Sequence, residues 1–255
     1  MPGNKLNQDK KTMKLTNIKY EKELWGRGLK FVIGVDEVGR GCLAGPLVAC
    51  AVAWSPEIAT FDWEKMKSEK ASNELSFLLE ITDSKKVSPR KREKLADLIK
   101  NYCLEYFIVE VSSEEIDELG VGEANKKALR KAALGIKNVE HVLVDHFSIF
   151  SSENKTYQSQ DNRMIPISET PITNGDLLSI SIASASIIAK VYRDKLMREK
   201  FHPLYPEYGF DKHVGYGTKL HLEAISKYGP CKIHRKSFRP IKNMKGLFVD
   251  KNTVP

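Results

Sequence analysis

Residues 31–48 constrain the fold of this chain more than any other stretch, because an apolar run there ends on two acids. The stretch reads Phe-Val-Ile-Gly-Val-Asp-Glu-Val-Gly-Arg-Gly-Cys-Leu-Ala-Gly-Pro-Leu-Val. Its β-branched beginning, residues 31–35, predicts a buried strand, and Asp36 and Glu37 follow that strand directly. Because a desolvated charge without a partner is costly, the two carboxylates require a partner, and a metal ion is one.

A turn and a second strand are predicted to follow the two acids. Gly39, Arg40 and Gly41 allow the backbone to turn tightly or to lie against a ligand. Gly45-Pro46 then breaks the chain, and the apolar run over residues 47–54 predicts a second strand. The expected unit is a hairpin with a glycine-flanked arginine at its mouth.

The composition favours a globular protein with a polyanionic partner. The chain has 255 residues, 41% of them hydrophobic, which is enough for one large domain or a domain with an appendage. The formal net charge of +8 favours nucleic acid as a partner. The four cysteines include no Cys-x-x-Cys pair, which argues against a zinc site or a disulfide framework and fits a reducing cytosol.

We expect a cytoplasmic protein with no membrane partner. No apolar run approaches the roughly 18 residues of a membrane span, and the Lys-rich N-terminus lacks the apolar core of a signal peptide. Shifts in composition predict four regions. These are a flexible extension over 1–16, a catalytic domain over 17–202, a basic substrate-binding subregion over 203–245 and a tail over 246–255.

Strands and helices are predicted to alternate along the catalytic domain. Besides the hairpin, apolar runs predict strands over residues 106–111, 141–145 and 164–167. Start signals, periodicity and breakers predict helices over residues 17–25, 89–102, 122–134, 179–201 and 218–228, with a short helix after Ser112 or Ser113. Residues 55–80 and 147–162 are interpreted as mostly loop. Five strands with intervening helices predict a mixed α/β sheet.

The basic subregion has the composition of a nucleic-acid groove. Over residues 212–245 the only acid is Glu223, and aromatic residues are interleaved with basic ones. The aromatic residues are Tyr216, Tyr228 and Phe238, and the basic ones include Lys212, Lys219, Lys227, Lys232, Arg235, Lys236, Arg239, Lys242 and Lys245. Glycines and a proline among them imply defined turns, which weakens the alternative of a merely solvated tail.

Four acids at the ends of predicted elements suggest a metal site. Asp36 and Glu37 close the first strand, Asp145 closes the fourth, and Asp176 precedes the long helix. If the first and fourth strands are neighbours, the carboxylates meet and repel one another, which implies hard cations such as Mg²⁺ or Mn²⁺. Two such cations are the usual means of in-line phosphodiester cleavage.

A geometric condition applies to the two adjacent acids. Consecutive residues on a strand face opposite ways. Asp36 and Glu37 can therefore both reach a metal only if the strand is already ending, or if one of them uses its backbone carbonyl.

Five ordered blocks within residues 20–240 resemble ribonuclease HII, the type 2 ribonuclease H family. They are 34–46 with its Asp-Glu-Val-Gly-Arg-Gly core, Asp-Ser-Lys-Lys over 83–86, Val-Leu-Val-Asp over 142–145, Gly-Asp at 175–176 followed by 181–194, and 212–218 with 233–238. The resemblance implies an RNase H-like mixed five-stranded sheet flanked by helices, with a mostly helical C-terminal subregion.

The resemblance also implies an activity. It implies endonucleolytic cleavage of the RNA strand of RNA/DNA hybrids, and a cut 5′ of a single ribonucleotide in duplex DNA that leaves 3′-hydroxyl and 5′-phosphate ends. A monomer is implied as well. The sister type, ribonuclease HIII, has lysine in the glycine turn, so Arg40 points to the HII type. The glutamine-aromatic motif of sliding-clamp-binding tails is absent from residues 246–255.

Site residues carry over from the resemblance by motif. Asp36, Glu37, Asp145 and Asp176 match the catalytic, metal-binding acids. Gly39, Arg40 and Gly41 match the turn that reads the ribose 2′-hydroxyl. Tyr216, with Tyr208 as the second candidate, matches the tyrosine that stacks on the adjoining deoxyribose. The remaining expected substrate contacts are to phosphate, from Lys85, Ser184, Lys190 and Arg193.

Two departures from the family pattern bear on the site. Cys42 stands where proline is more usual, and we interpret it as a packing residue and not as a catalytic thiol. The stretches 55–80 and 147–174 are longer than a compact member needs, and the second could shift how Asp176 is placed.

Two other readings compete with the metal-dependent nuclease. A non-catalytic nucleic-acid-binding protein would use the same basic surface, but it gains nothing from clustered carboxylates near phosphates. Another RNase H-like nuclease, such as a junction resolvase, would not need the Gly39-Arg40-Gly41 turn or Tyr216.

Overall fold

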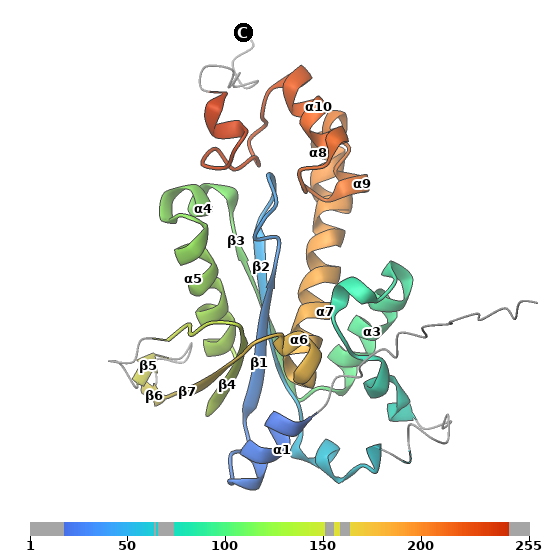
Figure 1. Ribbon diagram of the computed structural model, residues 1–255, viewed down its shortest axis with the longest axis vertical. Coiled ribbons are helices and arrows are strands. Elements are labelled where there is room, and N and C mark those ends of the chain that lie inside the picture. The colour runs from blue at the N-terminus through green and yellow to red at the C-terminus, as the bar shows by residue number, and fades with distance from the viewer. Residues whose placement is uncertain (1–17, 64, 66–73, 151–155, 159–163, 245–255) are drawn as a thin grey trace, which may run out of the picture.

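A five-stranded sheet with helices on both faces forms the centre of the protein (Figure 1). The computed structural model describes residues 18–63, 65, 74–150, 156–158 and 164–244. The strand order is β3-β2-β1-β4-β7. The strands are β1 (Val32–Val38), β2 (Leu47–Ala53), β3 (Glu105–Val111), β4 (His141–Asp145) and β7 (Ser168–Ile172). The predicted mixed five-stranded sheet is confirmed.

The predicted hairpin is present, but its first strand is longer than expected. β1 and β2 pair antiparallel from Ile33 opposite Ala53 to Val38 opposite Val48. Asp36 and Glu37 therefore lie within β1 and do not follow it. β4 pairs parallel with β1 on the other side, so the condition that the first and fourth strands are neighbours is met.

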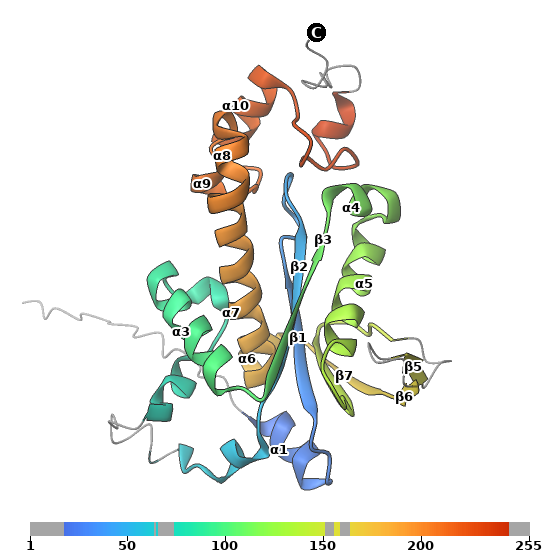
Figure 2. The same cartoon turned by 180° about the vertical axis from the view of Figure 1, so that it is seen from behind.

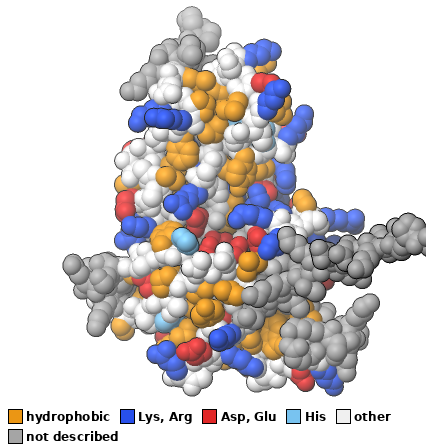
Figure 3. Space-filling view, viewed as in Figure 1, with side chains coloured by type: hydrophobic (Ala, Val, Ile, Leu, Met, Phe, Trp, Pro, Cys, Tyr) orange, Lys and Arg blue, Asp and Glu red, His pale blue; other side chains and the backbone are white. Residues whose placement is uncertain are grey.

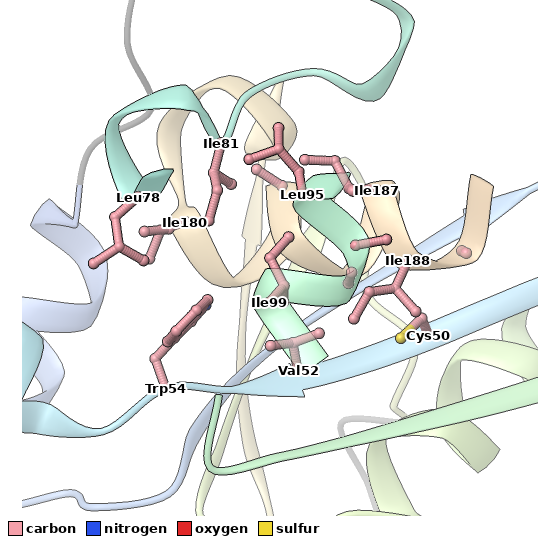
Figure 4. Close-up of a cluster of buried hydrophobic side chains, with 14 of the residues drawn as sticks. Cys50, Val52, Trp54, Leu78, Ile81, Leu95, Ile99, Ile180, Ile187 and Ile188 are labelled. Atoms are coloured by element: carbon pink, nitrogen blue, oxygen red, sulfur yellow. The ribbon is translucent and has the colours of Figure 1, made fainter. Parts of the chain in front are cut away.

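Helices cover the two faces of the sheet. On one face lie α7 (Ile180–Lys195) and α3 (Pro89–Tyr102), and on the other lie α5 (Val121–Leu134) and the short α4 (Ser113–Leu119). Figure 2 shows the same layers from behind. Side chains of α3, α7 and β2, among them Leu95, Ile188 and Val52, fill the core on the α7 face together with Trp54, which follows β2 (Figure 4).

The small residues of α7 let this helix lie against β1. A Cβ built on Gly34 would stand 2.2 Å from the backbone nitrogen of Ile182, so only glycine is tolerated at that position of β1. At the N-terminus of α7, the carboxylate of Glu21 accepts hydrogen bonds from the Ser179 hydroxyl and the Ser181 amide, at 2.5 and 3.0 Å. Glu21 belongs to α1 (Lys19–Gly26), which is thereby attached to the same helix.

Two sequence expectations on this part of the chain were wrong. The strand expected over 164–167 is β6 (Met164–Pro166), which pairs only with β5 (Thr156–Gln158) in a separate two-stranded sheet. The fifth strand of the main sheet is β7, and β5 lies within a stretch expected to be loop. The long helix expected over 179–201 is confirmed: α7 continues into a π-helical segment, Leu196–Phe201, and the short α6 (Gly175–Leu178) precedes it.

A smaller helical region lies beyond the C-terminal end of α7. It contains α8 (His202–Leu204), α9 (Phe210–His213) and α10 (Lys219–Tyr228), with 3-10 turns at Pro206–Tyr208 and Ile241–Asn243. Its apolar cluster includes Leu43 and Ala44 from the loop after β1. Three further 3-10 turns, Pro56–Thr60, Glu74–Glu80 and Ser84–Lys86, lie between β2 and α3. The predicted extension over 1–16 and the tail over 246–255 lie outside the described residues. In the described part, no helix is long and apolar enough to cross a membrane.

Candidate active site

The carboxylates gather where β4 ends beside β1. The parallel pairing of these strands stops at Val35 opposite Val144, whereas β2 remains paired with β1 as far as Val38. From Asp36 onward, one edge of β1 is therefore open on the side where β4 has ended. The acids line this open edge, and Asp145 is the last residue of β4.

Asp36 and Glu37 reach the same pocket from opposite faces of β1. Asp36 shares its face with Gly34, which packs on α7, and Glu37 shares its face with Val35, which packs with α5. Both carboxylates nevertheless line one pocket. The strand does not end early, as the sequence-based condition required it to, and both residues line the pocket because β1 is open on its β4 side beyond Val35.

The other two acids are brought together by α6. The backbone N–H of Gly175 donates to Oδ1 of Asp145 at 2.7 Å, and Asp176 follows in the first turn of this helix. Asn174 precedes it in the left-handed region, with φ of 58°. The long segment between Asp145 and Asp176 does not remove Asp176 from the pocket.

The pocket has a volume of about 540 Å³ and joins acidic, basic and glycine residues. Figure 3 shows Asp and Glu side chains near the middle of this face, with Lys and Arg side chains around them. The lining comprises Asp36, Glu37, Val38, Gly39, Arg40, Gly41, Ser84, Lys85, Asp145, Asp176, Ser186, Lys190 and Tyr216. Ten of the twelve residues expected from the sequence to form the site are among them.

Three of the four acids have pKa values above the usual range for a carboxyl group. Burial, followed by the charge of Glu37, raises the pKa of Asp36 well above its usual value. Burial also raises the pKa of Glu37, although the charge of Arg40 opposes this. For Asp176, burial and then the charges of Asp83 and Asp145 raise the pKa. Among the described residues, no Lys or Arg forms an ion pair with any of these three acids.

The Gly39-Arg40-Gly41 turn is held from behind by two buried guanidinium groups. Gly39 has φ of 92°, and a Cβ there would meet the Arg193 side chain at 2.2 Å. Arg193 donates to the carbonyls of Ala44, Pro46 and Val214 at 2.8–3.0 Å. Arg235 donates to the carbonyl of Arg40 at 2.9 Å and to that of Gly45.

Two expected phosphate contacts were wrong. Arg193 is fully buried and its donors face backbone carbonyls, so it holds the turn and cannot reach a phosphate. Ser184 is also fully buried and accepts a hydrogen bond from Nε1 of Trp54 at 3.1 Å, outside the pocket. The pocket-lining serine of α7 is instead Ser186, which donates to Ser84 at 3.0 Å.

Lys190 and Tyr216 lie side by side in the pocket. Nζ of Lys190 is 5.2 Å from the centre of the Tyr216 ring, and it also pairs with Asp194 at 2.7 Å. Asp194 pairs in turn with Arg92 at 3.6 Å, and Arg92 donates to the carbonyl of Val87, just after the Lys85 turn. The second tyrosine candidate, Tyr208, is buried and donates to the carbonyl of Gly229, so it is a core residue.

Sequence reasoning missed several residues that shape the site. Asn125 of α5 is buried and lies beside Glu37, where it opposes the rise in the pKa of Glu37 that burial causes. The Asn125 amide makes no hydrogen bond of normal geometry. Phe147 lies under Arg40, with 5.9 Å between the guanidinium carbon and the ring centre. Ser84 and Arg235 lie within blocks that carry the family resemblance, and that was the available signal. Nothing in the sequence singles out Asn125 or Phe147.

The donor set of the pocket suits a hard divalent cation. Carboxylate oxygens are the ligands that Mg²⁺ and Mn²⁺ prefer, and burial followed by neighbouring carboxylates raises the pKa of both Asp36 and Asp176. Within the described residues, no three His, Cys, Asp or Glu side chains are close enough together to hold a metal ion as they stand. The donor chemistry of the four carboxylates in the pocket nevertheless fits a hard divalent cation.

The fold and the pocket define a nuclease of the ribonuclease H type. The mixed sheet places acids from β1, β4 and α6 around one pocket, and basic side chains border it. The family model described as Ribonuclease HII matches residues 33–241. The chain belongs to the ribonuclease HII family, whose members are metal-dependent endonucleases that act on RNA/DNA hybrids.

A curated relative supports this assignment, and two solved structures share the fold. A ribonuclease HII from Caldanaerobacter subterraneus subsp. tengcongensis is 46% identical over 220 residues, which cover 86% of this chain and 78% of the relative. The ribonuclease H2 of Pyrococcus horikoshii shares the fold, with a TM-score of 0.63, 24% identity and coverage of 84% and 96%. The structure of Bst-RNase HIII in complex with Mn²⁺ has a TM-score of 0.55 and 19% identity, and the match covers 87% of this chain and 71% of that one.

Proposed function

We propose that this protein also cuts duplex DNA on the 5′ side of a single embedded ribonucleotide, leaving 3′-hydroxyl and 5′-phosphate ends. The observation that carries the proposal is one pocket in which four carboxylates, the Gly39-Arg40-Gly41 turn and Tyr216 all meet. A nuclease that reads only a long hybrid needs the acids and a basic surface. The glycine turn and the exposed tyrosine add the means to recognise one nucleotide.

The turn supplies recognition of the 2′-hydroxyl. Glycines at 39 and 41 bring the backbone to the pocket wall without side chains in between, and Gly41 has open space around it. Backbone N–H and C=O groups can then bond the 2′-hydroxyl, which is both donor and acceptor and distinguishes RNA from DNA. Arg235 keeps the turn in place through the carbonyl of Arg40.

Tyr216, Lys85 and Lys190 bind the strand next to the ribonucleotide. Tyr216 is 37% exposed, so its ring is available for stacking on the adjoining deoxyribose. Lys85 is exposed at the pocket rim, and Lys190 reaches the pocket from α7. Their charges suit the phosphates on either side of the cut.

The four acids are the metal ligands in this proposal. Asp36, Glu37, Asp145 and Asp176 would hold two Mg²⁺ or Mn²⁺ ions. When bound, the cations supply the activation of water and the charge stabilisation needed for in-line displacement at phosphorus. The chain itself orients the scissile phosphate through the turn, Tyr216 and Lys190. We expect the enzyme to act in the cytoplasm as a monomer.

A single cleavage assay tests this proposal. The protein is incubated with Mg²⁺ and an end-labelled DNA duplex that contains one ribonucleotide, beside an all-DNA duplex of the same sequence and an EDTA control. Asp36→Asn serves as the matched inactive variant. We expect one product that ends 5′ of the ribonucleotide, and none in the three controls.

Two outcomes would count against the proposal in different ways. No cut with either Mg²⁺ or Mn²⁺, together with retained duplex binding, would favour the non-catalytic reading for this substrate. Cleavage of a long RNA/DNA hybrid without cleavage of the single-ribonucleotide duplex would restrict the activity to hybrids and remove the recognition role of the turn and Tyr216.

A further inference from the structure

Three buried histidines form a cluster behind Tyr216 that the proposed reaction does not use. His213, His221 and His234 surround Phe210, with ring centres 4.3 Å apart for the first pair and 5.2 Å for the second. All three are buried. Burial lowers the pKa of His221 to about 4 and that of His234 to about 3, so both are neutral at physiological pH.

The hydrogen bonds determine which ring nitrogen of His221 carries the proton. Nδ1 of His221 lies 2.9 Å from the backbone carbonyl oxygen of Tyr216. A carbonyl oxygen only accepts, so Nδ1 must carry the hydrogen. In the neutral ring Nε2 is then an acceptor, and it lies 3.1 Å from Nε2 of His234. His234 must therefore donate from Nε2.

An independent contact leads to the same tautomer of His234. The backbone N–H of Cys231 donates to Nδ1 of His234 at 2.9 Å, a shorter contact than the 3.3 Å between this nitrogen and the Cys231 carbonyl oxygen, so we assign Nδ1 as the acceptor. A neutral His234 therefore carries its proton on Nε2, as the contact with His221 also demands. The result is a directed chain from the Cys231 amide through His234 and His221 to the carbonyl of Tyr216.

The chain ends at the turn that carries Tyr216 into the pocket. The Tyr216 amide donates to the carbonyl of His213 at 2.9 Å, and the Tyr216 carbonyl also accepts from the amide of Thr218 at 2.8 Å. Gly215, which directly precedes Tyr216, has φ of 88°, and a Cβ there would stand 2.4 Å from the carbonyl oxygen of Ala44. The backbone is thus fixed on one side while the ring faces Lys190 on the other.

We propose that His221 is a positioning residue for Tyr216, and that His234 and the Cys231 amide act by fixing the tautomer in which His221 can donate to the Tyr216 carbonyl. The proposal rests on the proposed role of Tyr216 in binding the strand at a single ribonucleotide. His221 touches neither substrate nor metal ligands in it. Its effect on cleavage passes entirely through the position of the tyrosine ring.

Two substitutions at His221 separate its two nitrogens. The amide of His221→Asn stands at the distance of Nδ1 from the backbone and can still donate to the Tyr216 carbonyl. The amide of His221→Gln stands at the distance of Nε2 and loses that bond. We expect His221→Gln to slow single-turnover incision of the one-ribonucleotide duplex by roughly 10- to 100-fold, and His221→Asn to stay within a few-fold of the unmodified protein.

A double-substitution cycle tests whether His221 acts through Tyr216. If it does, the variant carrying both His221→Gln and Tyr216→Ala incises no more slowly than Tyr216→Ala alone. Multiplication of the two effects would overturn the proposal, as would equal losses for His221→Asn and His221→Gln. His141→Gln is the matched control, since His141 is also buried and bonded, to Ser168 and Thr170, but at the far end of β4.

A measurement without substrate separates this proposal from the proposed function. Long-range ¹H–¹⁵N correlation NMR of the unmodified protein reports the tautomer of each histidine. We expect a proton on Nδ1 of His221 and on Nε2 of His234. The opposite tautomer at either ring would overturn the chain of hydrogen bonds even if the enzyme cuts. If both rings have the expected tautomers but the protein does not incise the one-ribonucleotide duplex, the proposed role of Tyr216 is wrong. The proposed positioning role of His221 is then wrong as well.

Discussion

Two clusters of ionisable side chains lie on either side of Tyr216, and they have opposite characters. The carboxylate cluster, Asp36, Glu37, Asp145 and Asp176, lines a pocket and has raised pKa values at three of its members. The histidine cluster, His213, His221 and His234, has lowered pKa values at all three.

The difference lies in what completes each cluster. The polar atoms of the histidine rings are all bonded to backbone groups or to one another, so the chain completes this cluster by itself. Among the described residues, Asp36, Glu37 and Asp176 form no ion pair with a Lys or Arg, and in the proposed function a cation completes their cluster. Burial is common to both, and what distinguishes a binding site from a structural cluster is the charge that remains unbalanced.

The largest expected effect concerns the carboxylate cluster. Asp36→Asn should lower cleavage by about 10³-fold or more, because it removes a metal ligand that contributes several kcal/mol to the transition state. Binding to an RNA/DNA hybrid should persist, since the basic surface is unchanged. Thermal stability should hold or rise, because a buried charge repelled by Glu37 and Asp145 has been neutralised. Single-turnover rates, fluorescence anisotropy and thermal melting measure the three quantities.

Glu93→Gln is the control, since Glu93 is exposed on α3 and lies outside the pocket. It should leave rate, binding and melting temperature unchanged. A parallel loss of binding and activity in Asp36→Asn would mean that this acid also organises the binding surface. A fall in stability would show that the carboxylates are already balanced by the chain, and the contrast with the histidines would fail.

The next effect separates basic residues that hold the fold from those that face the pocket. Arg193→Lys should lower the free energy of unfolding by about 2–3 kcal/mol, because a lysine cannot bond three carbonyls in one plane. It should leave the salt dependence of hybrid binding unchanged. Lys85→Ala should do the reverse, with stability unchanged within about 0.5 kcal/mol and the salt slope reduced by about 1.

Urea unfolding and binding titrations across salt concentrations make this comparison. A reduced salt dependence of hybrid binding in Arg193→Lys would mean that Arg193 does contact a phosphate, as expected from the sequence. An unchanged slope in Lys85→Ala would remove Lys85 from the binding surface.

The errors of sequence reasoning on α7 have a physical cause. This helix is buried nearly all around, so its apolar pattern does not distinguish its faces. Ser184 and Ser186 are two residues apart, yet one packs on Trp54 and the other lines the pocket. Arg193 looks like a surface cation in sequence, and only the carbonyls that converge on it show that it is structural. The faces of α7 are set by tertiary contacts that no local pattern contains.

The strands illustrate what local pattern can predict. The bounds of β4 and α3 were predicted correctly, because a compact apolar run and a Ser-Pro helix start are local signals. β7, with sequence Ser-Glu-Thr-Pro-Ile, carries neither signal. It is the edge strand of the sheet, where a proline is tolerated and one side needs no partner. Asp145 and Asp176 stand at the ends of recognisable elements, as expected from the sequence, whereas Asp36 and Glu37 stand inside β1 and were noticed because two acids interrupt an apolar run.

A smaller effect should appear in the pH dependence of stability. The pKa of His221 falls from 6.5 to about 4 on folding. The unfolded chain therefore binds a proton at this ring below pH 6.5, whereas the folded protein binds it only near pH 4. The stability due to the neutral ring is therefore fully present above pH 6.5 and declines as the pH falls towards 4. The gap in free energy of unfolding between the unmodified protein and His221→Asn should narrow by on the order of 2 kcal/mol between pH 7 and pH 4.

Chemical denaturation at a series of pH values measures that gap. A constant gap would mean that His221 has similar pKa values in the folded and unfolded states, and the histidine cluster would not be the closed, neutral unit described above. His234 is present in both proteins, and its own titration contributes to the difference only through its contact with His221.

The smallest effect is expected at Arg40, whose side chain faces the pocket like the carboxylates and whose backbone is held by the chain like the histidines. Its side chain is exposed and rests near Phe147, while its backbone carbonyl is held by Arg235. Arg40→Ala removes the side chain and leaves the backbone of the turn in place. The preference for a ribonucleotide over a deoxyribonucleotide should therefore fall by only about three- to tenfold, the contribution of one or two hydrogen bonds. The ratio of incision rates on matched duplexes, with and without the 2′-hydroxyl, measures it. An unchanged ratio assigns the recognition wholly to the backbone, whereas a loss of several hundredfold would mean that the guanidinium itself reads the hydroxyl and that Arg235 only supports it.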